Sequence, residues 1–296
     1  MIRLLDYIYN RSSKEENSMK LMMIAPMVLC ISHAAFGYTT QEIDAMNATA
    51  KPYFNKEKRL EPHPAGQLTE NVASFYDPKY HYTIYVPKAY TPDKLWPLLL
   101  CFSPSGNAGE YVKKMITVAE ECGWIVAGAI ESKNGPYEPI VENSFTMRYD
   151  IVSRYNICEP MIVYMGFSGG ARASAAFCFQ FFSNMTGGTI QCGAGHPGGD
   201  ADNPAKNKNA QVYVLCGKQD STLEESKSWY AKCRPAVAAA EFITFDGDHT
   251  LPANELLHDA LRWHTKQLIY SNPNGDEDLL AFRHQQIGRA SCRERV

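Results

Sequence analysis

Short apolar runs alternate with longer amphipathic stretches through the middle of the chain. Such runs, without an exposed polar face, are typical of strands buried in a parallel sheet. They span residues 81–87, 97–102, 124–130, 161–167, 189–192, 212–217 and 241–245. Helical patterns lie near 108–122, 140–156, 222–239 and 253–270. The alternation predicts an α/β fold: a mostly parallel, doubly wound sheet with helices on both faces.

Polar segments bound this pattern at both ends. A polar, Tyr-rich lead over 38–75 precedes the first apolar run, and a polar break at 272–275 follows the final helical pattern. That last helix is predicted to be amphipathic, because its apolar positions recur at helical spacing. The residues that share its apolar face are Leu256, Leu257, Ala260, Leu261 and His264.

The apolar run at 161–167 ends in Gly-x-Ser-x-Gly, and a helical run of small residues follows at once. Gly166 and Gly170 leave room for a sharp strand-to-helix turn that holds Ser168 in a strained conformation. The N–H of Gly169 would face a developing oxyanion at the helix N-terminus. We therefore predict Ser168 as a catalytic nucleophile. The alternative is an ordinary Gly-rich turn without a catalytic role.

A nucleophilic serine needs a base, and the base needs an acid to orient it. Asp220 lies in a Gly-x-x-Asp loop after the sixth apolar run, where its side chain would stand at the carboxyl end of a strand. Asp220 could instead only cap the helix that begins near Thr222. Asp246 and Asp248 are rival acids, but they lie too close in sequence to the candidate base to orient it from across the site.

His249 follows the last apolar run in a Gly-x-His loop and completes the chain order Ser, Asp, His. His196, in the Gly-rich loop after the run at 189–192, is the one real rival. His258 and His264 lie on the final helical pattern, where a surface or core role is expected. The remaining histidines lie in the leader, before the serine or in the polar tail: His33, His63, His81 and His284.

Three blocks of the sequence resemble those of a known family: Gly-Phe-Ser-Gly-Gly (166–170), Gly-Lys-Gln-Asp-Ser-Thr (217–222) and Gly-Asp-His-Thr-Leu-Pro (247–252). They look like the catalytic blocks of the polyhydroxybutyrate-depolymerase-like and feruloyl-esterase-like branch of the α/β-hydrolase superfamily. The resemblance covers about residues 75–270. It implies the α/β-hydrolase fold and hydrolysis of carboxylic esters through an acyl-enzyme, without a cofactor.

The second oxyanion donor is expected from the loop after the apolar run at 97–102. Many hydrolases carry His-Gly at this point, whereas this chain has Ser103-Pro104. Because Pro104 has no N–H, the Ser105 N–H is the best candidate, with that of Gly106 next. Three further residues are predicted to line the substrate pocket: Ser103, Phe167 and His196.

Only residues 195–210 separate the apolar run at 189–192 from the next one. The segment is polar and too short for a helical lid, so we expect an open pocket. An open pocket suits bulky or polymer-attached esters, such as aryl, acetyl-polysaccharide or polyester substrates, better than the long acyl chains of lid-dependent lipases.

Two other functions are compatible with these motifs. A serine peptidase of the prolyl-oligopeptidase type uses the same triad, although nothing in the chain resembles the propeller domain of that class. A non-catalytic, hydrolase-fold binding module is suggested by the missing His-Gly, but the intact order of Ser, Asp and His argues against it.

The composition argues against some partners and ligands but does not indicate a function. The chain of 296 residues is 45% hydrophobic and 21% charged, as in ordinary globular proteins. A formal net charge of −3 gives no reason to expect nucleic acid or an anionic membrane as a partner. The sequence contains no metal-spaced Cys/His cluster and no Gly-rich phosphate loop.

The N-terminal segments have the features of an export signal behind an upstream region. We expect residues 1–18 to be an untranslated upstream region, because Lys14-Glu15-Glu16 can be encoded by a purine-rich bacterial ribosome-binding site before Met19. Residues 19–37 combine a basic start, a short apolar core and small residues, as in a signal peptide. The protein is thus expected to be bacterial, and secreted or periplasmic. A lipoprotein site at Cys30 is disfavoured because a Leu precedes that cysteine.

The predicted hydrolase domain spans residues 38–272. Two segments follow it. Residues 273–286 are expected to be a linker or the start of a truncated region. Residues 287–296 resemble a translated sequencing-library adapter. The alternative is a basic natural tail.

Seven of the nine cysteines remain after Cys30 and Cys292 are set aside, so an exported form has at least one free thiol. Three of the seven lie in apolar strands, where a small buried hydrophobic residue is expected: Cys101, Cys192 and Cys216. The other four lie on or beside helices and are candidates for pairing, which the sequence leaves open: Cys122, Cys158, Cys178 and Cys233.

Overall fold

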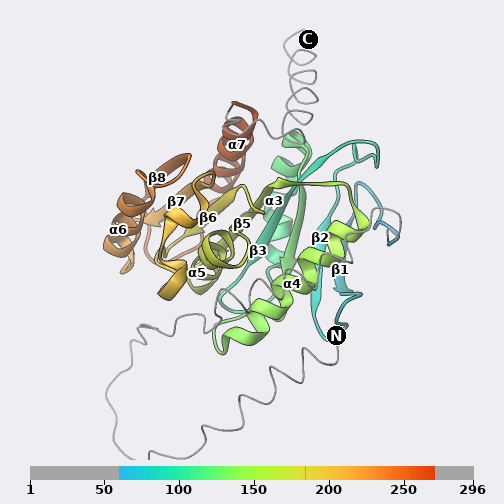
Figure 1. The fold of residues 1–296 in the computed structure, drawn as a ribbon, viewed down its shortest axis with the longest axis horizontal. Coiled ribbons are helices and arrows are strands. Elements are labelled where there is room, and N and C mark those ends of the chain that lie inside the picture. The colour runs from blue at the N-terminus through green and yellow to red at the C-terminus, as the bar shows by residue number, and fades with distance from the viewer. Residues whose placement is uncertain (1–59, 184, 271–296) are drawn as a thin grey trace, which may run out of the picture. The chain divides into compact units, whose positions relative to one another are not determined.

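A computed structural model describes residues 60–183 and 185–270, which contain one eight-stranded sheet (Figure 1). Its strand order is β1-β2-β4-β3-β5-β6-β7-β8. The strands are β1 (Leu68–Ala73), β2 (His81–Tyr85), β3 (Trp96–Phe102), β4 (Ile125–Ala129), β5 (Ile157–Phe167), β6 (Gly188–Cys192), β7 (Gln211–Gly217) and β8 (Ala239–Phe245). The α-helices are α3 (Gly109–Cys122), α4 (Tyr137–Arg154), α5 (Gly169–Ala176), α6 (Leu223–Cys233) and α7 (Asn254–Tyr270).

The sheet is mostly parallel, which confirms the predicted fold class. Strand β2 runs antiparallel to both β1 and β4, and every other pairing is parallel. Figure 1 shows β1 at one end of the sheet and β8, beside α6, at the other. Parallel neighbours end at the same edge of the sheet, so the loops that follow β3, β5, β7 and β8 meet along one edge.

Helices cover both faces of the sheet because successive strand residues point to opposite sides. On β3, Leu98 and Leu100 pack in a cluster with residues of α4 and α5, whereas Leu99 and Cys101 pack with α3 and α7. On the far side of α5, a third apolar cluster joins it to β7 and α6 through residues such as Trp229. Both faces of the central strands are therefore buried, as their uninterrupted apolar sequences require.

Local chemistry sets where several helices end. Helix α3 ends at Cys122, and Gly123 follows with a φ of 75°, which a residue without a side chain adopts easily. Helix α6 ends at Cys233, short of the predicted limit near residue 239, because Pro235 has no N–H to continue the helical hydrogen bonds. Helix α5 is also short, and a π-helical turn, Phe177–Phe181, continues it.

Strand β1 is an addition that the apolar pattern did not predict. It lies within the lead over 38–75, and its sequence, Leu-Thr-Glu-Asn-Val-Ala, is half polar. It is an edge strand with a register irregularity between Thr69 and Val72, and Asn71 adopts a φ of 54°. An edge strand with one exposed side needs no continuous apolar run, so hydrophobic patterning does not reveal it.

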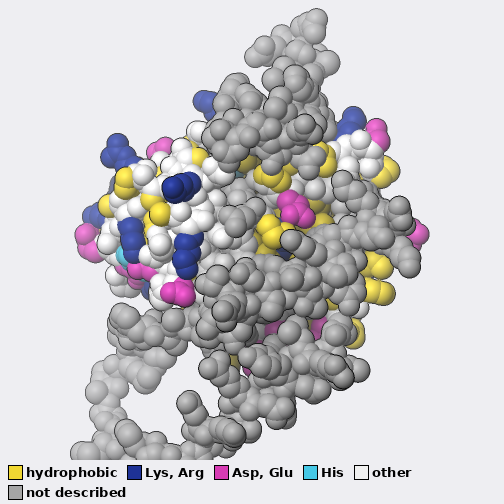
Figure 2. Space-filling model, viewed as in Figure 1, with side chains coloured by type: hydrophobic (Ala, Val, Ile, Leu, Met, Phe, Trp, Pro, Cys, Tyr) yellow, Lys and Arg dark blue, Asp and Glu magenta, His cyan; other side chains and the backbone are white. Residues whose placement is uncertain are grey.

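The segment between β6 and β7 contains only two short 3-10 turns, Gly199–Ala201 and Pro204–Asn207. This agrees with the expectation that no helical lid is built there. Figure 2 shows Lys and Arg side chains mixed with acidic ones over the neighbouring end of the molecule, near α6. Lys232, for example, pairs with Asp202 at 2.9 Å. Charges of both signs alternate there, so this face offers no field of a single sign.

Several expectations concern other parts of the chain. The segments 1–18, 19–37, 273–286 and 287–296 lie outside the described residues. No helix in the described ranges is long and apolar enough to cross a bilayer. Five of the cysteines in the described ranges are buried free thiols: Cys101, Cys178, Cys192, Cys216 and Cys233.

Candidate active site

Ser168 occupies a strained turn between β5 and α5. Its φ of 54° and ψ of −119° are rare for a residue with a side chain. The turn depends on the two flanking glycines: a Cβ on Gly166 would stand 2.1 Å from the Gly170 carbonyl oxygen, and one on Gly170 would stand 2.2 Å from that of Phe102. No side chain fits at either position, which is the requirement behind Gly-x-Ser-x-Gly.

Asp220 and His249 reach this turn from the ends of β7 and β8. The two loops meet at Gly217, where a Cβ would stand 2.4 Å from the carbonyl oxygens of both Gly247 and Asp248. This close approach places the loop that carries His249 in contact with the loop that carries Asp220. A glycine at the end of β7 is therefore a structural condition for the meeting of the two side chains.

The three side chains form one continuous hydrogen-bonded chain. His249 Nε2 lies 2.9 Å from Ser168 Oγ, and His249 Nδ1 lies 2.9 and 3.0 Å from the two Asp220 carboxylate oxygens. The Asp220 side chain is fully buried, whereas the His249 side chain is 38% exposed. The structure thus brings together the three residues that the sequence selected, with a buried carboxylate behind a ring that faces solvent.

Thr222 fixes the carboxylate from the opposite side. Its N–H and its hydroxyl both donate to Asp220 Oδ1, at 2.7 and 2.8 Å. These bonds satisfy the buried carboxylate and hold its plane toward the ring of His249. The helix-start role that was the alternative for Asp220 is therefore combined with the contact to His249.

The rival acid Asp246 is not part of the hydrogen-bonded chain from Ser168 to Asp220. It forms an ion pair with Lys218 at 2.7 Å on the surface. The hydrogen bond from Lys218 holds the pKa of Asp246 below its ordinary value. Asp246 is thus already paired with a cation.

Phe167 and Gly193 enclose the histidine. The Phe167 ring lies 4.8 Å from the His249 ring, centroid to centroid. Gly193 has a φ of +64°, and a Cβ there would stand 2.9 Å from the Phe167 ring, 3.1 Å from Asp220 Oδ2 and 3.3 Å from His249 Nδ1. Sequence reasoning missed Gly193; its only signal was its place directly after β6.

The predicted oxyanion loop lies beside the turn, and its donors are partly engaged. Ser103 is buried, and its Oγ accepts the Ser105 N–H at 3.3 Å. The Ser103 and Ser105 hydroxyls are 3.2 Å apart. The predicted donor, the Ser105 N–H, is therefore directed at a side chain of its own loop.

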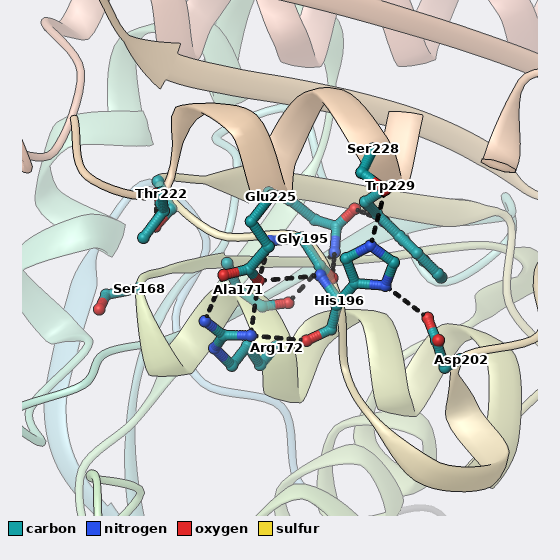
Figure 3. Close-up of polar contacts among 12 residues, drawn as sticks. Ser168, Ala171, Arg172, Gly195, His196, Asp202, Thr222, Glu225, Ser228 and Trp229 are labelled. Carbon is teal, nitrogen blue, oxygen red and sulfur yellow. Dashed lines mark hydrogen bonds and ion pairs between the residues drawn. The ribbon is translucent and has the colours of Figure 1, made fainter. Parts of the chain in front are cut away.

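His196 takes no part in the chain of contacts around Ser168. Its Nδ1 lies 2.7 Å from Asp202 and its Nε2 3.4 Å from Ser228, and its ring packs against Trp229 (Figure 3). Burial acts to raise the pKa of Asp202, but hydrogen bonds from Lys232 and His196 hold it below its ordinary value. His196 is thus an anchor of its loop in this structure.

Arg172 and Glu225 tie the surroundings of the site together, and neither was selected from the sequence. Arg172 bonds both Glu225 carboxylate oxygens and also donates to the His196 carbonyl at 2.9 Å (Figure 3). Glu225 in turn accepts the N–H groups of Gly195 and His196. Their partners lie on separate elements, so spacing along the chain gives no hint of the pair.

A metal site is not evident in the described part of the chain, where no three His, Cys, Asp or Glu side chains are grouped to hold an ion. The chemistry available at this edge is that of a serine, a histidine and a buried carboxylate, with the start of α5 directed at the serine. Such a group suits nucleophilic attack assisted by a base.

Comparisons with solved structures identify the fold. An esterase from the hyperthermophilic archaeon Pyrobaculum calidifontis superposes with a TM-score of 0.53 at 10% identity, over 79% of this chain and 95% of its own. A ferulic acid esterase gives 0.52 at 19% identity, over 68% and 98%. Est1E from Butyrivibrio proteoclasticus gives 0.54 at 13% identity, over 69% and 100%.

The sequence comparisons return no counterpart. No protein-family model matches, and no curated protein matches significantly. The structural likeness, at these low identities, concerns the backbone and the order of its elements. With its mostly parallel eight-stranded sheet and a strained serine turn after β5, this chain has the α/β-hydrolase fold.

Proposed function

We propose that the protein is a serine hydrolase that cleaves carboxylic esters through an acyl-enzyme on Ser168. The observation that carries the proposal is the unbroken chain from Ser168 Oγ through His249 to the buried Asp220. The esterases among the structures of similar fold support the same reaction class. Ester hydrolysis by this route needs no cofactor.

In the first half of the reaction, Ser168 Oγ attacks the ester carbonyl carbon while His249 Nε2 accepts the hydroxyl proton. The carbonyl π electrons move to oxygen and give a tetrahedral oxyanion, which the Gly169 N–H stabilises. When the C–O bond to the alcohol breaks, His249 returns the proton to the leaving oxygen. An acyl group then remains on Ser168, and the alcohol is free.

In the second half, water replaces the alcohol. His249 Nε2 takes a proton from water, the hydroxyl oxygen bonds to the acyl carbon, and the proton passes to Ser168 Oγ as the acid leaves. Asp220 stays ionised throughout, keeps the proton of His249 on Nδ1 and stabilises the imidazolium that forms twice per cycle.

We further propose aryl, acetyl-polysaccharide or polyester substrates. The support is the accessibility of the base: the His249 side chain is 38% exposed, and only short 3-10 turns connect β6 to β7. A base that stands at the surface can serve an ester carried by a bulky or polymeric group. A ferulic acid esterase is among the structures of similar fold.

The test combines labelling and a substrate panel on the full chain. Wild type should react with a fluorophosphonate probe and should hydrolyse p-nitrophenyl acetate and methyl ferulate faster than p-nitrophenyl laurate. Ser168→Ala should lose both reactions, since loss of the triad serine costs on the order of 10⁶ in turnover. Equal labelling of wild type and Ser168→Ala would refute the assignment.

We also propose that the protein is exported, on the strength of the signal-like segment 19–37. Expression in a bacterium followed by N-terminal sequencing of the periplasmic protein should give a chain that begins at Tyr38. A product that stays in the cytoplasm would contradict the proposal, whereas one that begins at an acylated Cys30 would show export as a lipoprotein instead of cleavage before Tyr38.

A further inference from the structure

The loop after β3 is short of free backbone N–H donors for an oxyanion. Pro104 has no N–H, the Ser105 N–H donates to Ser103 Oγ at 3.3 Å, and the Gly106 N–H donates to the Ser103 carbonyl at 3.5 Å. The second oxyanion donor, which usually comes from this loop and acts beside the Gly169 N–H, is thus missing. One N–H alone stabilises a developing oxyanion far less than two, so a second donor from elsewhere would complete the site.

The loop after β4 supplies residues at that position. Ser105 and Lys133 form an antiparallel bridge, and the Asn134 N–H donates to the Pro104 carbonyl at 2.7 Å. These backbone bonds lock the loop after β4 against the loop after β3. Asn134 is thereby held at the edge of the sheet where Ser168 lies, although the strand before its loop, β4, contributes nothing to the triad.

The Asn134 carboxamide lies directly against the residue after the nucleophile. A Cβ on Gly169 would stand 1.8 Å from Asn134 Oδ1 and 3.2 Å from Asn134 Nδ2. The amide therefore occupies the space that a side chain at position 169 would fill. Asn134 is exposed, and its carboxamide has no hydrogen-bond partner among the described residues. Its polar end is thus available to a molecule bound over Ser168.

We propose that Asn134 completes the oxyanion hole with its side-chain Nδ2–H, beside the Gly169 N–H. The inference rests on the proposed ester hydrolysis at Ser168 and adds a residue to it. As Ser168 Oγ bonds to the carbonyl carbon, negative charge builds on the carbonyl oxygen. A half-turn of the terminal amide exchanges its two ends without moving the rest of the side chain, and places Nδ2–H toward that oxygen. The hydrogen bond strengthens as the charge grows.

Gly169 has a second function under this proposal. Any side chain there would displace the Asn134 amide, so the absence of a Cβ and the presence of Asn134 belong to one arrangement. Gly169→Ala should push the amide aside and act like removal of Asn134. The two substitutions should therefore be non-additive.

The experiment compares Asn134→Ala and the isosteric Asn134→Asp with wild type on p-nitrophenyl acetate. Both should lower kcat by about 10²–10³-fold while KM changes little, because the lost bond forms in the transition state. The Ki of a trifluoromethyl ketone, which forms an oxyanion on Ser168, should rise in parallel. Lys133→Ala, in the same loop, is the control and should behave as wild type.

The cycle with Gly169→Ala provides the second readout. Gly169→Ala and the double variant Gly169→Ala/Asn134→Ala should show about the same kcat as Asn134→Ala. A kcat of Asn134→Ala and Asn134→Asp within a few-fold of wild type would overturn the inference, and so would additive losses in the cycle. If wild type neither labels nor turns over esters, the proposed function itself fails. Thermal melting should show all these variants folded, because the Asn134 side chain is exposed.

Discussion

Arg172 and Glu225 form a two-pronged ion pair, with Nη1–Oε1 at 2.5 Å and Nη2–Oε2 at 2.7 Å. The pair joins α5, which begins directly after Ser168, to α6, which begins directly after the loop of Asp220. About a quarter of each side chain is exposed. Parallel hydrogen bonds between charged groups are stronger and more directional than a single contact.

The stability of the fold should depend measurably on this pair. A double-mutant cycle with Arg172→Ala and Glu225→Ala should give a coupling free energy of about 1–2 kcal/mol in chemical denaturation. Glu225→Ala should cost more than Arg172→Ala, because Glu225 also accepts the N–H groups of the His196 loop.

The matched control for this cycle is the more exposed pair of Arg262 and Glu121, whose side chains are 42% and 40% exposed. The same cycle there should give less than about 1 kcal/mol. Equal coupling free energies in the two pairs would show that the ion pair between α5 and α6 stabilises the fold no more than an exposed surface pair.

Gly193 should prove essential for catalysis rather than for folding alone. Gly193→Ala adds a Cβ in a left-handed conformation, within 3.3 Å of Asp220 Oδ2 and His249 Nδ1. We expect a loss in stability of about 1–2 kcal/mol and a fall in kcat of about 10²-fold, because small displacements of catalytic groups are costly.

Gly198→Ala separates the two effects. Gly198 has a φ of +82°, and a Cβ there would meet nothing within 4 Å. This variant should lose at least as much stability, because a φ of 82° with a ψ of 163° is adopted almost only by glycine, and it should keep its kcat. A Gly193→Ala protein with the kcat of wild type would show that the triad tolerates a side chain at that point.

Asp220 and Asp246 should differ sharply when each is changed to Asn. Asp220→Asn removes the acceptor that keeps the His249 proton on Nδ1, so kcat should fall about 10⁴-fold. Asp246→Asn breaks only a surface ion pair with Lys218 and should leave kcat within a few-fold of wild type. Steady-state kinetics on p-nitrophenyl acetate decides. A large effect at Asp246 with a small one at Asp220 would reverse the assignment of the acid.

Acid should destabilise the fold through His264. Burial lowers the pKa of this histidine to about 3, from an ordinary value of 6.5. As the pH falls below about 6.5, the unfolded chain gains a proton that the folded protein excludes, so the free energy of unfolding decreases until the pH approaches 3. His264→Gln should flatten the decrease between pH 6.5 and 5.

His258, on the same helix, is the control for this pH dependence. It is not fully buried and bonds the Lys114 carbonyl at 2.8 Å. Denaturation of His258→Gln at several pH values should show the slope of wild type. If His264→Gln keeps that slope as well, the acid sensitivity comes from other groups.

Features that depend on one strand or one turn could be predicted from the sequence. Buried strands such as β3 must be apolar on both faces, so their runs are visible without a structure. The serine turn is visible because Gly166 and Gly170 are forced by backbone contacts. The chain order of Ser168, Asp220 and His249 follows from the order of the strands that bear them.

Features that depend on contacts between distant loops could not be predicted. Asn134 lies in a polar, exposed loop, and only the folded backbone brings it against Gly169. The donor predicted at Ser105 was plausible by position, yet a side chain two residues earlier accepts its N–H. The pattern of apolar and polar residues does not reveal such hydrogen bonds, because their partners are set by the way the strands are arranged in the sheet.

The base, His249, follows β8, which has fewer neighbouring strands than β5 or β7. Strands β5 and β7, which precede Ser168 and Asp220, have a neighbour on each side, whereas β8 pairs with β7 alone among the described residues and is only half buried. Elements with fewer buried contacts open at lower free energy than the whole fold. A brief detachment of β8 would move His249 away from Ser168. The serine would then lack its base and be inactive, while the rest of the sheet stays intact. Warming should therefore inactivate the protein before it melts it.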